Sequence, residues 1–228
     1  MLRNIRISSL VLICLVLLSC SPSRFVRTIP KGQTQLSGTL GGPMQNLFGM
    51  TIPTPYTTIA VGHGLKDDLT LFGGLHTTAL LFKTLQLDIG ATKRLYQADS
   101  SGFIPSLSSS FSINSLVDLN EGEYDIYPQI DLNAYWSFGK GNKHFFYLGI
   151  ATWTDLQPLK AHGEIQETSV LFNPHLGTNL ALNKWNLTLE YKVLGLGQSN
   201  QDVVVNYAKW HGERSVPGIF VGFAKTIN

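Results

Sequence analysis

Charged side chains occupy the polar faces of several segments in which apolar and polar residues alternate. They are Asp88, Arg94, Asp131, Glu190 and Lys192. If these faces point into a closed structure, the charges are buried, and a buried charge needs a partner. We therefore expect a polar network of carboxylates with arginine and lysine that fills and fixes an interior. The alternative is that the same groups line a path for a proton, an ion or a ligand.

The histidines give no evidence of a catalytic or metal site. They are His63, His76, His144, His162, His175 and His211. No two of them have the close, regular spacing of metal ligands, and no HExxH motif occurs. Serine and acidic residues are present as well, but their spacing defines no arrangement with a histidine. We predict no catalytic residue, no metal and no cofactor.

The elements that hold the charged residues have the period of β-strands. Between residues 85 and 96, Leu85, Leu87 and Ile89 fall on one face, and Gln86 and Asp88 fall on the other. This alternation is typical of strands with two different faces. It recurs along the chain, and we expect ten strands, at 33–42, 57–65, 69–82, 85–97, 103–117, 127–139, 144–155, 168–182, 185–195 and 217–226.

Strand length and connection length indicate a barrel that crosses a membrane. A tilted strand needs about 9–11 residues to cross the hydrocarbon, and many of these strands are that long or longer. Every second connection is short, and most of the others are longer, as in outer-membrane barrels. Aromatic residues near the strand ends predict interfacial girdles: Tyr56, Phe82, Tyr96, Phe103, Tyr127, Phe138, Phe145, Trp153 and Trp185.

Composition narrows the class of protein. Charged residues make up 14% of the chain, below the usual quarter, and the formal net charge is +2. No basic block occurs, which argues against nucleic acid as a partner. Of the two cysteines, Cys14 lies in the N-terminal apolar run, so the mature chain keeps only Cys20 and forms no disulfide within itself.

The first twenty residues resemble the signal of a bacterial lipoprotein. Arg3 and Arg6 precede an apolar run, which ends in Leu17-Leu18-Ser19-Cys20. This ending is similar to a lipobox, and the resemblance implies cleavage before Cys20 and lipid attachment to its thiol. By the same resemblance, an Asp after the cysteine would favour retention in the inner membrane, and Ser21 permits export to the outer one. An ordinary secretory signal and an uncleaved anchor are the alternatives.

The whole chain resembles a lipoprotein signal followed by a small outer-membrane β-barrel, Bacteroidetes-like in its organisation. The predicted fold is all-β: an antiparallel up-and-down barrel of about ten strands, of the transmembrane type. Residues 1–19 are the signal peptide, 20–32 a lipidated tether and 33–228 the barrel domain. The chain ends in Ala-Lys-Thr-Ile-Asn, which departs from the terminal aromatic residue of many such barrels.

These observations favour a lipid-anchored barrel in the outer membrane, with its N-terminus on the periplasmic side and no catalytic activity. Its role would be structural, adhesive or accessory, with membrane lipid and envelope proteins as partners. One alternative is a tethered periplasmic barrel of lipocalin type that binds an apolar ligand, which would turn the apolar faces inward. Another is a small outer-membrane acyl hydrolase.

Overall fold

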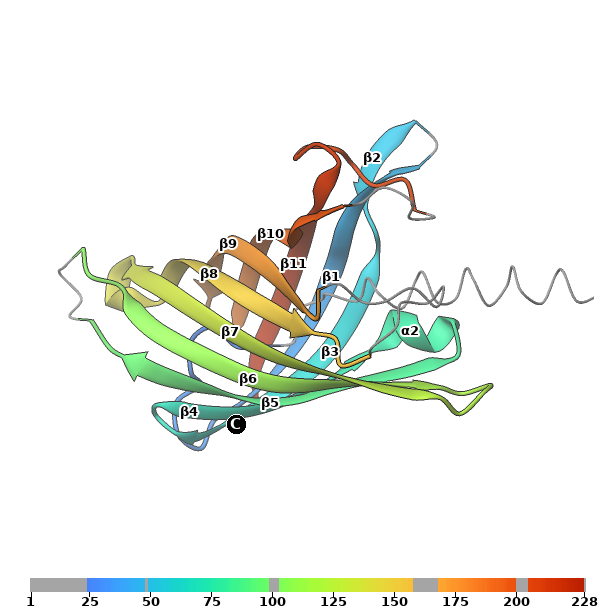
Figure 1. The fold of residues 1–228 in the computed structure, drawn as a ribbon. Coiled ribbons are helices and arrows are strands. Elements are labelled where there is room, and N and C mark those ends of the chain that lie inside the picture. Colours follow the sequence, from blue (N-terminus) through green and yellow to red (C-terminus); the bar gives the residue numbers. More distant parts are fainter. Residues whose placement is uncertain (1–23, 48, 99–102, 158–167, 200–204, 228) are drawn as a thin grey trace, which may run out of the picture.

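Strands with alternating apolar and polar residues close into a barrel in this protein (Figure 1). The structure is a computed structural model, and it describes residues 24–47, 49–98, 103–157, 168–199 and 205–227. The elements are β1 (Thr34–Leu47), β2 (Met50–Pro53), β3 (Tyr56–Lys66), β4 (Leu69–His76), α2 (Thr77–Leu81), β5 (Thr84–Tyr96), β6 (Ser106–Asp118), β7 (Tyr124–Phe138), η1 (Lys140–Asn142), β8 (His144–Thr154), β9 (Val170–Leu182), β10 (Trp185–Ser199) and β11 (Arg214–Ile227).

The sheet is antiparallel and closes on itself. From β4 to β10, each strand pairs with the strands before and after it. β1 pairs with β3 and with β11, which closes the barrel. The closing register runs from Thr34 opposite Ile227 to Pro43 opposite Gly218. Leaving out the short β2, ten strands form the wall. The predicted fold class, an up-and-down barrel of about ten strands, is confirmed.

The two ends of the barrel differ in their connections. One end, which we call the turn end, holds the start of β1, the end of β11 and the β3–β4, β5–β6, β7–β8 and β9–β10 connections. The other end, which we call the loop end, holds the remaining connections, β2 and α2. The β3–β4 and β9–β10 turns have only two residues each, whereas residues 155–169 and 200–213 connect strands at the loop end.

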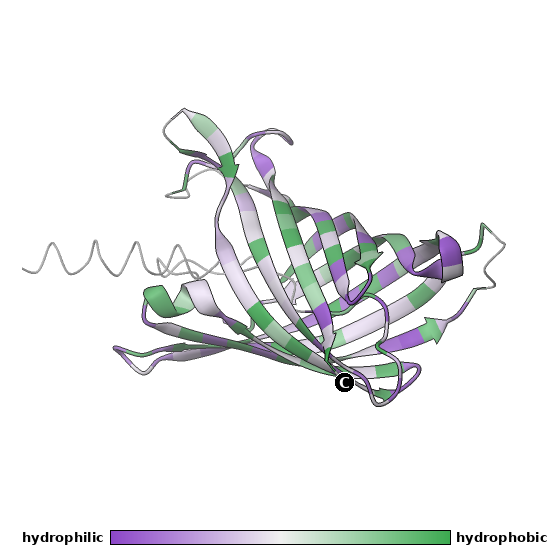
Figure 2. Cartoon of the chain, turned by 180° about the vertical axis from the view of Figure 1, so that it is seen from behind, coloured by the Kyte–Doolittle hydropathy of each residue, from purple (hydrophilic) through white to green (hydrophobic). Residues whose placement is uncertain are grey.

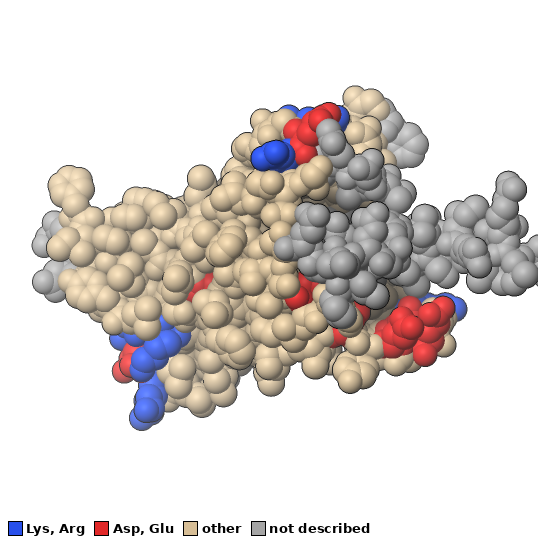
Figure 3. Space-filling model, in the orientation of Figure 1, with Lys and Arg blue, Asp and Glu red and all other residues tan. Residues whose placement is uncertain are grey.

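Polarity is reversed relative to a soluble protein. Outward positions carry large exposed apolar side chains, such as Ile89 at 70% and Leu148 at 52% exposure, whereas the inward Thr70 and Thr92 are fully buried. Figure 2 shows the alternation along the wall, and in Figure 3 charged atoms gather mainly toward the ends of the molecule. This is the distribution of a transmembrane β-barrel. Among the described residues, no helix has the length and apolar character needed to span a bilayer.

The predicted aromatic girdle is only partly correct. Tyr96, Phe138 and Trp185 are exposed on the outside. Four other members lie buried on the lumen side: Tyr56, Tyr127, Phe145 and Trp153. Tyr127 and Trp153 pack with their ring centroids 4.9 Å apart. The prediction failed for these four because aromatic residues favour strands on either face.

The predicted strand 69–82 is wrong at its end. β4 stops at His76, and α2 follows. Thr78 accepts a hydrogen bond through its hydroxyl from the backbone N–H of Thr57 (2.9 Å), and the hydroxyls of Thr57 and Thr77 lie 2.6 Å apart. Threonine side chains thus take the place of the next ladder bonds, which ends the strand and lets the chain turn into a helix.

The first strand is longer than predicted. β1 continues past Gly42 to Leu47 and forms a hairpin with β2, within a stretch that we had expected to be a loop. Gly41 has a φ of 140°, and a Cβ there would collide with the backbone of β11. The Gly-Gly-Pro sequence therefore bends the strand and does not end it. Tyr207 bridges Gln45 on the other side of this extension.

Candidate functional site

Residues 24–32, which we call the lumen segment, lie inside the barrel. Gly32 at the turn end donates its backbone N–H to the carbonyl of Gly64 (2.8 Å). Further in, the N–H of Ile29 bonds the hydroxyl of Thr70 (2.8 Å), and Ser108 donates to the carbonyl of Val26 (2.6 Å). Residues 20–32 are predicted to form a lipidated tether. Their described part instead occupies the lumen.

Glycines on the inner wall make room for this segment. A Cβ on Gly62 would lie 2.5 Å from the ring of Phe25 and 2.8 Å from the side chain of Ile29. A Cβ on Gly64 would collide with the backbone of Ile29 and Pro30. Small inward residues therefore serve close approach of a second piece of chain.

Apolar side chains of the segment have their own positions in the lumen. The ring of Phe25 lies 6.2 Å from that of Phe72, between centroids. Val26 packs in a buried cluster with Tyr135, Phe145 and Tyr147. Both contacts bury apolar surface between the segment and the wall, and this burial stabilises the segment inside the lumen.

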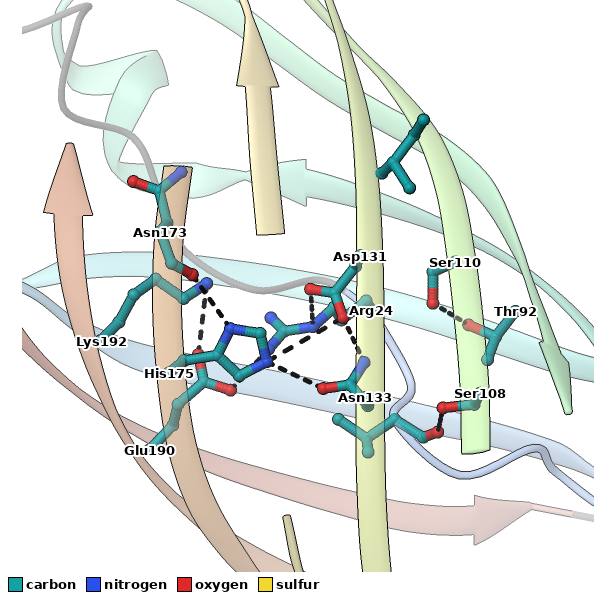
Figure 4. A network of polar contacts seen from close by, with 12 residues as sticks. Arg24, Thr92, Ser108, Ser110, Asp131, Asn133, Asn173, His175, Glu190 and Lys192 are labelled. Atoms are coloured by element: carbon teal, nitrogen blue, oxygen red, sulfur yellow. Dashed lines mark hydrogen bonds and ion pairs between the residues drawn. The ribbon is translucent and has the colours of Figure 1, made fainter. Parts of the chain in front are cut away.

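The guanidinium of Arg24 stands between two carboxylates (Figure 4). Its Nε forms an ion pair with Oδ2 of Asp131 at 2.6 Å, and its Nη2 donates to Oε2 of Glu190 at 2.8 Å. Only 8% of the Arg24 side chain is exposed. Arginine suits this position because its planar group can bond two carboxylates at once.

Other polar groups complete the Arg24 cluster, which we define as Arg24, Asp131, Asn133, Tyr147, His175, Glu190 and Lys192. Glu190 also accepts a hydrogen bond from the hydroxyl of Tyr147 (2.8 Å) and forms an ion pair with Lys192 (3.3 Å). Asn133 donates to Asp131, and its carbonyl oxygen lies 2.8 Å from Nε2 of His175. Each carboxylate therefore has partners on the wall besides Arg24.

A second group, the His76 cluster, lies nearer the loop end and consists of Thr58, His76, Gln86, Asp88 and Asn114. Nε2 of His76 lies 2.7 Å from Oδ2 of Asp88, and Nδ1 lies 3.3 Å from the hydroxyl of Thr58. Asn114 donates to Asp88 and accepts from Gln86 (3.0 Å). These five residues come from the neighbouring strands β3 to β6, and all are buried.

The structure distributes the five predicted network residues over different places. Asp131, Glu190 and Lys192 meet in the Arg24 cluster. Asp88 lies in the His76 cluster. Arg94 is half-buried on the inner face of β5 and belongs to neither group. Cys20, the predicted lipid attachment site, lies outside the described residues.

Sequence reasoning missed the arginine that joins the two carboxylates. Arg24 belongs to no alternating segment, so a search of strand faces could not find it. Its signal was indirect: the predicted inward faces carry three carboxylates against Arg94 and Lys192. An excess of buried acid implies a cation from elsewhere in the chain. His76 and His175 were missed because histidine fits either face.

The chemistry available to these groups is limited. Among the described residues, no group of three or more histidine, cysteine, aspartate or glutamate side chains could hold a metal ion. Thr58, His76 and Asp88 form a hydroxyl, imidazole and carboxylate line, but the hydroxyl-bearing residue is only 2% exposed. The arrangement serves to satisfy buried polar groups and to hold the lumen segment.

Comparisons with known proteins find similar architectures only at a distance. The translocator domain of the autotransporter NalP from Neisseria meningitidis matches with 12% identity and a TM-score of 0.43, over 98% of this chain and 95% of that one. An outer membrane channel from Pseudomonas putida F1 matches with 11% identity and a TM-score of 0.48, over 92% and 100%. The outer membrane protein OprG from Pseudomonas aeruginosa matches with 11% identity and a TM-score of 0.31, over 90% and 100%.

No protein family matches the sequence, and no curated protein matches it either.

Proposed function

We propose that this chain is a lipid-anchored β-barrel of the bacterial outer membrane, with a structural, adhesive or accessory role at the cell surface. The observation that carries the proposal is the reversed polarity of a closed barrel. Apolar side chains such as Leu132 and Ile130 are about half exposed, while their neighbours Asp131 and Asn133 are buried inside. A wall of this kind is stable in lipid and would be exposed to water in a soluble protein.

The same observation argues against a carrier of lipocalin type. Such a barrel needs its apolar faces inside, around the ligand. Here Leu87 and Ile89 point outward, and the lumen is filled by polar side chains and by residues 24–32. The apolar-ligand alternative is therefore not favoured.

Two observations support a role without catalysis or free passage of solutes. The line of Thr58, His76 and Asp88 is buried, so a substrate has no direct access to its hydroxyl. The lumen segment occupies the interior of the barrel from the turn end inward. Contacts with other molecules would then be made by the loop end, including the β1–β2 hairpin.

Fractionation of expressing cells tests the location. We expect the protein in the outer-membrane fraction, resistant to carbonate washing, with a gel mobility that changes on boiling. Metabolic labelling with a palmitate analogue should mark the wild type and not the Cys20→Ala variant. Extraction of the wild type by carbonate would contradict a membrane-embedded barrel, and absence of label would contradict only the anchor.

A charge on the outer wall tests the orientation. Leu132→Arg places a cation halfway along β7. It should lower the free energy of unfolding in bilayers by about 2–4 kcal/mol. Leu182→Arg is the matched control at the turn end, where the expected loss is about 0–1 kcal/mol. Urea titration of the heat-modifiable band measures both. Equal, small losses would show that this face does not meet lipid.

A further inference from the structure

The lumen segment occupies the interior of the barrel without being part of its wall. Residues 24–32 contain no helix or strand, and the β1–β11 pairing completes the barrel independently of them. We propose that the lumen is a binding site for a short basic and aromatic peptide. The protein's own segment is the ligand, and its departure opens a cation-selective path.

The contacts are those of a docked peptide. Arg24 forms ion pairs with two carboxylates, and the ring of Phe25 packs over Gly62 beside Phe72. Among the described residues, four hydrogen bonds join the segment's backbone to the barrel, at Val26, Ile29, Lys31 and Gly32. Recognition rests on a cation and a ring in adjacent positions.

The carboxylates of the wall have partners both with the segment in the lumen and without it. Without Arg24, Glu190 keeps the hydroxyl of Tyr147 and the ammonium of Lys192. Asp131 keeps the hydrogen bond from the side-chain amide of Asn133, and Nε2 of His175 lies 4.0 Å from its Oδ1. A carboxylate that lost all of its partners would make departure very costly. Because these carboxylates retain neighbours, the segment can leave at a moderate cost in free energy.

Departure leaves space along the inner wall of β3 in the turn-end half of the barrel. The Phe25 and Ile29 side chains lie over Gly62, and the backbone of Ile29 and Pro30 lies over Gly64. Glycine has no side chain that could fill the space. Among the described residues, the buried charged side chains of the wall are three carboxylates, Asp88, Asp131 and Glu190, against one cation, Lys192. Half-buried Asp125 and Arg94 also lie on inward faces. The excess of negative charge favours cations.

Conductance of the purified protein in planar bilayers tests this proposal, which rests on the membrane-spanning barrel proposed above. Wild type should be closed almost all of the time. Arg24→Ala should raise the open probability by at least about tenfold, the change expected for a loss of ~1.4 kcal/mol from the closed state. Glu190→Gln, which keeps shape and removes one charge, should give a smaller rise. Lys93→Ala, outside the lumen, is the control and should behave as wild type.

A peptide added in solution tests the binding site directly. On the Arg24→Ala/Phe25→Ala variant, a synthetic peptide with the sequence of residues 24–32 should restore closure. The same peptide with alanine in place of its first arginine should be at least about tenfold weaker, again for ~1.4 kcal/mol. Changing Asp131→Asn in the open variant should reduce the preference for potassium over chloride in a salt gradient.

The outcomes separate this proposal from the proposed function. A heat-modifiable band shows that a variant has folded, and a barrel that never inserts would contradict the proposed function first. Folded Arg24→Ala and Glu190→Gln variants that stay as closed as wild type would overturn the removable segment. Open variants that ignore the peptide, or prefer anions, would overturn the binding site or the cation path respectively.

Discussion

The two polar clusters of the lumen hold different things together. The Arg24 cluster joins the wall to an inserted piece of chain through ion pairs of a guanidinium with Asp131 and Glu190. The His76 cluster joins only neighbouring strands of the wall, through one histidine and one carboxylate with amide and hydroxyl partners. The His76 cluster thus fixes strands of the wall to one another, and the Arg24 cluster fixes the lumen segment to the wall.

The two clusters also differ in what the loss of one member removes. In the Arg24 cluster, each carboxylate contacts Arg24 and further groups on the wall. In the His76 cluster, Asp88 is the shared acceptor for His76 and Asn114. Loss of Asp88 should therefore disturb the wall more than loss of Arg24, because it takes a carboxylate acceptor from two buried donors of the wall itself.

The largest effect is expected from Asp88→Ala. It removes an acceptor shared by His76 and Asn114 at buried positions, and it should lower the free energy of unfolding by about 2–6 kcal/mol, at about 1–3 kcal/mol for each of the two donors. Urea-induced unfolding in detergent micelles, followed by tryptophan fluorescence, measures the loss. Asp88→Asn keeps the size and part of the bonding and should cost less. If both variants were as stable as wild type, the cluster would not fix the wall.

A smaller loss of about 1.5–3 kcal/mol is expected from Arg24→Ala, the usual range for hydrogen bonds to charged groups. Asp131 and Glu190 keep their other partners, which limits the damage. The same unfolding experiment applies. A loss as large as that of Asp88→Ala would contradict the distinction between the clusters and would make the segment an integral part of the wall.

Gly62→Val should act on the occupant of the lumen alone. The added side chain would overlap Phe25 and Ile29, so it should displace the segment at a cost of about 1–3 kcal/mol. A protease added from the turn end should then cleave near Arg27 faster than in wild type. Gly73→Val is the control, because a Cβ there would meet nothing closer than 3.4 Å. Equal cleavage rates would show that the glycine does not hold the segment in place.

The smallest effect is expected from Asp68→Asn at the exposed turn end. Lys93 donates a hydrogen bond to Asp68 (2.5 Å) and lowers the pKa of its carboxyl group below the ordinary value. A lowered pKa in the folded state contributes stability above the ordinary aspartate pKa, and this contribution is lost as the pH falls through the lowered value. Solvent and salt screen the pair, so the variant should unfold at the urea concentration of wild type in high salt. A clear shift would mean that exposed pairs matter as much as the lumen clusters.

The period of the sequence was sufficient to predict the wall. On β5 and β7 the predicted inward residues, such as Gln86 and Asn133, are buried, and the outward Ile89 and Leu132 are exposed. A change of face would place every apolar side chain of a strand on the wrong side, so alternation determines orientation strongly. It could not locate the end of β4, where threonine hydroxyls replace ladder bonds, or the bend at Gly41.

The lumen depended on information that alternation does not contain. The sequence alone determined that carboxylates at 88, 131 and 190 face inward and need partners, because their strands have one polar side. Only the tertiary structure decided that Arg24 is the partner of two of them, that His76 is the partner of the third, and that glycines make room for residues 24–32. The physical reason is that the Arg24 contacts join positions more than a hundred residues apart, through a segment without periodic pattern, and depend on how the closed barrel shapes its interior.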